Sequence, residues 1–160
     1  MFKKLSCLLL GAAPLAATAQ TDDCAAPVLK LLRNGQEIPA TGSAPAPRVT
    51  LQVTAAPDCP GPATYRFRWA EVTLIRNGRP VLPTFRVTQP QADLKALMSA
   101  AQPGDHVYVF IPYANLATVG ADGKLQLYRA TRPAQPKPRQ LDLTTDESRG
   151  INFTWKLVRE

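Results

Sequence analysis

A β-strand is plainest in the run VTLQVT at residues 49–54, where apolar and polar side chains alternate. This period of two is typical of a strand with one buried and one solvated face. The run YRFRW at residues 65–69 repeats it, and places Tyr65, Phe67 and Trp69 together on the face that we expect to be buried. Because the period recurs through most of the chain, the sequence predicts a mainly β fold, an antiparallel β-sandwich of the immunoglobulin-like class.

Beyond the last of these rings, the apolar positions shift by one residue, to Val72 and Leu74. A bulge inserts one extra residue into a strand and so shifts the phase of everything after it. We therefore expect one continuous strand with a bulge near Ala70 and Glu71.

Two Asn-Gly dipeptides, at residues 34–35 and 77–78, mark hairpin turns. Asn-Gly favours the positive backbone angles of a two-residue hairpin loop. The segments around them, residues 31–39 and 74–82, resemble each other. We interpret this likeness as reuse of a favourable hairpin rather than as a repeat architecture.

A short helix is expected at residues 91–101, where every third or fourth residue is apolar. Pro103-Gly104 ends it. We expect its apolar face to cover an open end of the core. This face consists of Leu94, Leu97, Met98 and Ala101.

Strand patterns resume at residues 106–111, and again at 125–128 after the turn Asp122-Gly123. The last strand is expected at residues 151–158. Phe153 and Trp155 belong to the face of this strand that we expect to be buried.

The first nineteen residues have the pattern of a cleavable secretory signal. Two lysines precede an apolar stretch at residues 5–15, which is shorter than the roughly 20 residues needed to span a bilayer. Small residues at Ala17 and Ala19 place the cut before Gln20. Cys7 lies near the start of the apolar stretch rather than after it, which argues against a lipid anchor. We therefore expect an extracytoplasmic protein, either periplasmic or secreted.

The mature chain, residues 20–160, has the size of a single domain. Loss of the signal removes two lysines, which lowers the net charge from +7 to about +5. The mature chain has no further apolar run long enough to span a membrane, so we expect no transmembrane segment.

Cys24 and Cys59 are the cysteines that remain after cleavage. An even pair in a protein directed to an oxidising compartment predicts a disulfide bond. A redox or metal-binding role is disfavoured, because the two cysteines lack C-x-x-C spacing and His106 is the only histidine available to assist them.

No residue pattern indicates catalysis, a metal or another cofactor. A nucleophile needs a base oriented by a third group, but Asp105 and His106 would point to opposite faces of a strand. Zinc needs three or four convergent ligands, and no cluster supplies them. The nine glycines mark turns rather than a phosphate-binding loop. We therefore expect a protein that is not an enzyme.

The sequence disfavours two other classes of protein, a glycosidase and a nucleic-acid-binding protein. The carboxylates Glu37, Glu71 and Asp93 are distant in sequence and could meet as the acid pair of a glycosidase, although surface charge explains each of them. A nucleic-acid platform needs exposed rings beside basic groups. Alternation in residues 65–69 places the rings opposite the arginines, so we expect no nucleic-acid partner.

A cationic surface is the candidate site for a ligand or partner. Arg66 and Arg68 lie on the solvated face of their strand, and the neighbouring hairpin carries further arginines. Such a patch suits an acidic protein or an anionic glycan, while arginines on outer strands also discourage unwanted pairing. The candidate patch consists of Arg66, Arg68, Arg76, Arg79 and Arg86.

Five segments of the second half carry a family likeness. They are VTLIRNG at 72–78, the helix at 94–101, PGDHVYV at 103–109, the turn DGK at 122–124 and the strand at 151–157. In this order the chain, roughly from residue 68 to 158, resembles the C-terminal domain of GldM, the gliding-motility and type IX secretion protein of Bacteroidetes. Relative to that pattern, residues 129–149 form an insertion.

The resemblance implies a periplasmic β-sandwich that makes protein contacts and has no enzymatic activity. Full-length family members also carry a motor helix and several periplasmic domains, which this sequence does not show. We expect an extracytoplasmic interaction module whose partner is another envelope or secreted protein. The alternative is a secreted binding protein for an anionic glycan or another acidic ligand. A third hypothesis, a sorting domain of secreted cargo, draws on KLV at residues 156–158 but lacks the usual Gly-Tyr pattern.

Overall fold

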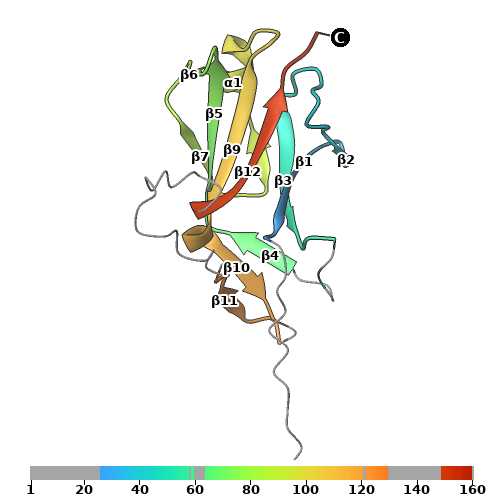
Figure 1. The fold of residues 1–160 in the computed structure, drawn as a ribbon, viewed down its shortest axis with the longest axis vertical. Helices are drawn as coiled ribbons and strands as arrows, with labels where there is room; N and C mark the ends of the chain where they lie inside the picture. The colour runs from blue at the N-terminus through green and yellow to red at the C-terminus, as the bar shows by residue number, and fades with distance from the viewer. Residues whose placement is uncertain (1–25, 58, 60–63, 121, 130–148, 160) are drawn as a thin grey trace, which may run out of the picture.

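Antiparallel strands dominate the computed structural model, which describes residues 26–57, 59, 64–120, 122–129 and 149–159 (Figure 1). The first sheet runs in the order β2 (Gln36–Glu37), β1 (Val28–Arg33), β3 (Arg48–Thr54) and β8 (Gln91–Asp93). The second runs in the order β12 (Gly150–Lys156), β9 (His106–Pro112), β5 (Ala70–Arg76) and β6 (Arg79–Pro80), with β7 (Phe85–Val87) also paired to β5. The third runs in the order β11 (Leu125–Leu127), β10 (Leu116–Val119) and β4 (Thr64–Phe67).

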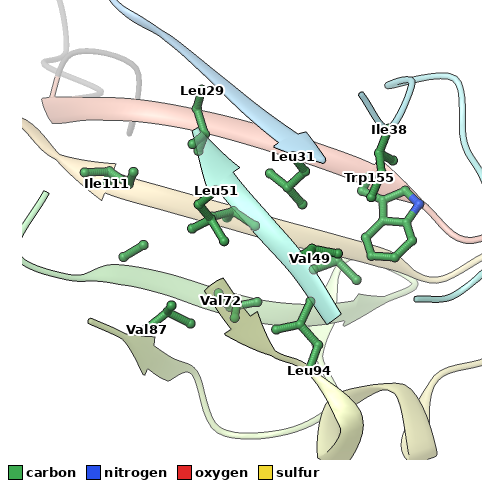
Figure 2. Close-up of a cluster of buried hydrophobic side chains, with 14 of the residues drawn as sticks. Leu29, Leu31, Ile38, Val49, Leu51, Val72, Val87, Leu94, Ile111 and Trp155 are labelled. Carbon is green, nitrogen blue, oxygen red and sulfur yellow. The ribbon is translucent and has the colours of Figure 1, made fainter. Parts of the chain in front are cut away.

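The first two sheets face each other and enclose the main core between them. Val49, Leu51 and Val53 of β3 are buried, as their alternation predicts, while the residues between them are more exposed. Figure 2 shows side chains from β1 and β3 meeting side chains from β5, β7 and β9. The labelled members include Leu29, Leu31, Val49, Leu51, Val72, Val87 and Ile111. The prediction of an antiparallel β-sandwich is confirmed.

The last strand also follows its predicted alternation. β12 pairs with β9 over its whole length, from Gly150 opposite Pro112 to Lys156 opposite His106. Trp155 is fully buried, as predicted, whereas Phe153 is only partly buried against the core.

The predicted bulge near Ala70 and Glu71 is wrong. β4 ends at Phe67 and pairs with β10 in the three-stranded sheet, whereas β5 begins at Ala70 and pairs with β9 in another sheet. The backbone N–H of Arg68 still donates to the carbonyl of Asn115, at 2.9 Å, so the chain leaves the small sheet directly after that bond. The shift in apolar phase therefore marks the passage of the chain from one sheet to another.

The predicted helix is shorter than expected and begins later. Residues 91–93 form β8, in which Ala92 lies opposite Val49 and is buried. The Asp93 side chain accepts a hydrogen bond from the backbone N–H of Lys95, at 2.9 Å, where the chain turns into α1 (Lys95–Ala100). The predicted apolar face is correct: Leu94 and Leu97 are buried in the core, and Met98 and Ala101 pack against it.

Both predicted Asn-Gly hairpins are confirmed. Asn34 and Gly35 have φ values of 51° and 81°, and Asn77 and Gly78 have values of 51° and 74°. Positive values at both central residues are those of a type I′ turn, whose twist suits adjacent antiparallel strands. The turns join β1 to β2 and β5 to β6.

The loop before β3 reaches across to the end of the last strand. Ser43 forms an isolated parallel bridge with Leu157. Its backbone N–H donates to the Lys156 carbonyl and its carbonyl accepts from Val158, both at 3.1 Å. The indole N–H of Trp155 donates to the Ser43 hydroxyl at 3.0 Å. This loop therefore ties the first sheet to the C-terminal end of β12.

Several predictions concern residues outside the described part of the chain. These include the signal sequence with its cut before Gln20, Cys24, and the interior of the proposed insertion at residues 129–149. The Cys24–Cys59 disulfide stays a prediction. None of the helices formed by the described residues has the length and apolar character needed to cross a membrane.

Candidate functional site

The structure distributes the five candidate arginines over separate places. Arg76, at the end of β5, is engaged internally: its guanidinium donates to both carboxylate oxygens of Asp105, each at 2.8 Å, and to the Ala100 carbonyl at 3.0 Å. These hydrogen bonds raise the pKa of Arg76. Asp105 is only 2% exposed, so this arginine serves to neutralise a buried acid rather than to attract a ligand.

Arg86 is also engaged within the protein, in a contact with an aromatic ring. It lies on β7 opposite Glu71, and its guanidinium carbon sits 4.3 Å from the ring centroid of Trp69. Trp69 is partly exposed rather than buried, which contradicts the prediction made from its alternation. The reason is its position between β4 and β5, where it belongs to neither sheet.

The remaining three arginines lie at opposite ends of the molecule. Arg79 is exposed on β6, at the end that also carries α1 (Figure 1). Arg66 lies on β4, within the three-stranded sheet at the other end, and Arg68 follows directly after that strand. Arg66 and Arg68, two residues apart, are both exposed at this end, away from Arg79.

One face of the three-stranded sheet closes that end of the core. Tyr65 and Phe67 pack against the core cluster and are partly buried, so the sequence correctly placed them opposite Arg66 but overstated their burial. Tyr128 lies between Tyr65 and Tyr113, with ring centroids 6.0 and 5.3 Å away. Burial raises the pKa of all three phenols, which therefore stay protonated at neutral pH.

The opposite face of the same sheet is apolar and exposed. Cross-strand pairing places Leu127 opposite Ala117 and Leu125 opposite Val119, and on the far side of β10 the same two residues pair with Arg66 and Thr64 of β4. Leu125 is 61% exposed and Leu127 is 70% exposed, far more than the other large apolar side chains on the described surface. We call Leu125, Leu127, Ala117, Val119, Thr64 and Arg66 the outer face of the small sheet. Exposed apolar side chains that are contiguous are typical of interaction surfaces.

Sequence reasoning identified a strand at residues 125–128 but missed this surface. The run LQLY alternates as a half-buried strand does, and no local signal shows that its leucines point away from the core. Its position at the edge of a sheet whose other face already carries Tyr65, Phe67 and Leu116 leaves the leucines in solvent.

A groove of about 880 Å³ lies between β3 and β4. The solvated face of β3 contributes Thr50, Gln52 and Thr54, and β4 contributes Thr64 and Arg66. Hydroxyl, amide and guanidinium groups beside aromatic rings suit a hydroxylated or anionic ligand. The groove is thus a second surface to which the predicted Arg66 belongs.

The positions considered for catalysis are separated. His106 lies on β9 between Ile75 and Lys156, while its neighbour Asp105 is held by Arg76. The three carboxylates proposed for a glycosidase lie on β2, β5 and β8, and Glu37 pairs with Lys30 at 2.8 Å. Within the described ranges, no group of three His, Cys, Asp or Glu residues could hold a metal ion.

Comparison with known proteins finds no family model, no curated protein and no solved structure that matches this chain.

Proposed function

We propose that this protein is a non-enzymatic extracytoplasmic module that binds another envelope or secreted protein. The observation that carries the proposal is the outer face of the small sheet. Two leucines there are more than half exposed, on the edge strand of the sheet at one end of the molecule (Figure 1). In the free protein, the apolar surface of these side chains stays in water. A protein partner that covered it would gain the favourable free energy of burying that surface.

The resemblance to the GldM C-terminal domain supports the same class of function. Its segments fall on the β5–β6 hairpin, α1, β9, the turn at Asp122-Gly123 and β12. A role near gliding motility or type IX secretion, and a periplasmic or secreted location after cleavage before Gln20, belong to this proposal. They rest on the quoted segments and on the signal-like pattern of residues 1–19.

Binding of an anionic glycan or another acidic ligand is the second candidate. The groove between β3 and β4 favours it, because Arg66 lies there beside the hydroxyls of Thr50, Thr54 and Thr64. Exposed charges of this kind act over about 8 Å at physiological ionic strength, so such binding weakens steeply with salt.

The two candidates are separated by capturing partners from envelope extract at about 0.15 M and about 0.5 M salt, which roughly halves the screening length. We expect one defined protein to survive both washes and to be lost when Leu125→Ser and Leu127→Ser are combined. The matched control is Phe85→Ser, which replaces another exposed apolar side chain, 36% exposed, on β7.

Capture that is unaffected by the paired leucine variant, or reduced equally by Phe85→Ser, would contradict the protein-binding proposal. Glycan binding that is abolished by Arg66→Glu and by 0.5 M salt, with no protein retained, would favour the second candidate instead.

A further inference from the structure

We infer that β11 binds an extended segment of the partner as an added β-strand, and that this segment is apolar with acidic flanks. The inference rests on the proposed protein-binding function and specifies the partner's chemistry and mode of attachment. It concerns β11 together with the outer face of the small sheet.

Among the described residues, one edge of β11 is not paired with another strand. Tyr128 donates to the Leu116 carbonyl and Gly120 donates to the Lys124 carbonyl, both at 2.9 Å, so residues 124 and 128 bond toward β10. In an antiparallel pair, hydrogen-bonded and non-hydrogen-bonded residues alternate along each strand. Leu125 and Leu127 therefore direct their N–H and C=O groups away from β10, and β10 is the strand that pairs with β11 in the described structure.

The same two residues also supply the exposed apolar side chains. An added strand would thus form main-chain hydrogen bonds with Leu125 and Leu127 while its own alternate side chains lie beside theirs. Val119 and Ala117 extend this apolar strip across the sheet toward Arg66. A segment with apolar residues at every second position fits the strip, because the side chains on one face of a strand repeat every two residues.

The charges of the small sheet favour an acidic partner. Lys124 and Arg129 flank β11 directly, while Arg66 lies across the sheet on β4 and Arg68 follows that strand. Asp122 is the acid near them in the described chain, and it pairs with Lys124 at 3.3 Å. A second copy of the chain would bring the same cations together, and like charges in apposition disfavour pairing. An apolar segment flanked by Asp or Glu would pack against the apolar strip and pair its carboxylates with these cations.

The test starts from a display library of random linear ten-residue peptides, selected against the whole mature protein at about 0.15 M salt. We expect the selected peptides to have alternating apolar residues and acidic ends. For one such peptide, Leu125→Ser combined with Leu127→Ser should weaken binding about 10-fold or more, as loss of an anchor at an interface does. Phe85→Ser should leave it unchanged.

Two peptide variants test the mode of attachment. Replacing the acidic ends by lysines should weaken binding, and Arg66→Glu with Arg129→Glu should reverse that preference. Methylating the peptide's backbone nitrogens on one edge should abolish binding while the side chains stay the same. In the complex, hydrogen exchange should slow at the amides of Leu125 and Leu127, whose N–H groups would become bonded.

Four results would overturn the inference: no enrichment of peptides, enrichment of basic peptides, undiminished binding of the methylated peptide, or a dimer that disperses in the paired leucine variant. If the peptides fail but an envelope protein is still captured through Leu125 and Leu127, strand addition is wrong and the proposed function stands. If that capture fails as well, both are wrong.

Discussion

Trp155 and Trp69 have similar alternating sequence contexts but different surroundings in the fold. Trp155 is fully buried between the sheets and donates to Ser43, whereas Trp69 is partly exposed beneath Arg86. Replacing Trp155 by alanine should lower the free energy of unfolding by roughly 3 to 5 kcal/mol. Replacing Trp69 should lower it by about 1 kcal/mol or less, the size of an exposed contact between a cation and a ring.

Urea denaturation of the two alanine variants measures this difference directly. Each variant keeps one tryptophan, so its fluorescence also reports how well the remaining ring is shielded. Equal losses of stability in the two variants would contradict the positions described for these rings.

Asp105 gives the fold a dependence on acid pH. Hydrogen bonds from Arg76 hold the pKa of this carboxyl below its usual value, with help from the backbone N–H of Gln102 and against the effect of burial. Because the pKa is lower in the folded state, the ionised carboxylate stabilises the fold above the unfolded pKa of about 4. That contribution is lost as the pH falls through the folded value.

We therefore expect Asp105→Asn to lower the melting temperature at pH 7, and the gap between variant and wild type to narrow below about pH 4. Melting curves at several pH values between 3 and 7 would measure it. Asp122→Asn is the matched control, since this acid is 53% exposed in its pair with Lys124 and should change little. A gap that stays constant down to pH 3 would argue against the role of the pair.

At the scale of elements, two glycines are required for different reasons. Gly78 adopts a φ of 74° in the β5–β6 turn with open space around it, so alanine there should cost about 1 to 2 kcal/mol through backbone conformation alone. Gly150 begins β12 with no room for a side chain: a Cβ would lie 2.6 Å from the Phe110 ring and would also collide with the Ile111 carbonyl.

Gly150→Ala should therefore destabilise the protein more than Gly78→Ala, because the β9–β12 pairing has to shift to admit the methyl group. Gly35→Ala serves as a second turn control, since Gly35 has a similar positive φ and open surroundings. Thermal unfolding of the three variants compares them, and a smaller effect at Gly150 than at the two turns would contradict the packing described.

Elements with a strong local pattern were predictable, and those defined by distant pairing were not. β3, β9 and both Asn-Gly hairpins follow from alternation and turn chemistry that act within a few residues. Residues 91–93 were expected to be helical because Leu94 and Leu97 share a helical face, but pairing with β3 made them a strand. The shift in apolar phase after Phe67 was interpreted as a bulge, because no local sequence pattern shows that the chain passes from one sheet to another there.

At the scale of the whole molecule, the sequence identified charges but not their neighbours. The five arginines were grouped because alternation places Arg66 and Arg68 on a solvated face, and the neighbouring hairpin carries the other three. The fold sends Arg76 to Asp105, Arg86 to Trp69, and Arg66 to a different sheet from Arg79. The exposure of Leu125 and Leu127 likewise depends on which face of the small sheet the core occupies. Both outcomes are set by three-dimensional arrangement, which local periodicity does not encode.

The bridge between Ser43 and the end of β12 has a consequence for the order of folding. Trp155 and Ser43 are 112 residues apart, and β12 also supplies the outer neighbour of β9. Contacts of such long sequence separation form late, because a long loop must close before they repay its entropy. During synthesis from the N-terminus, the first sheet is complete in sequence long before its covering tryptophan exists. The core of the nascent chain therefore stays partly exposed to water until β12 has been synthesised.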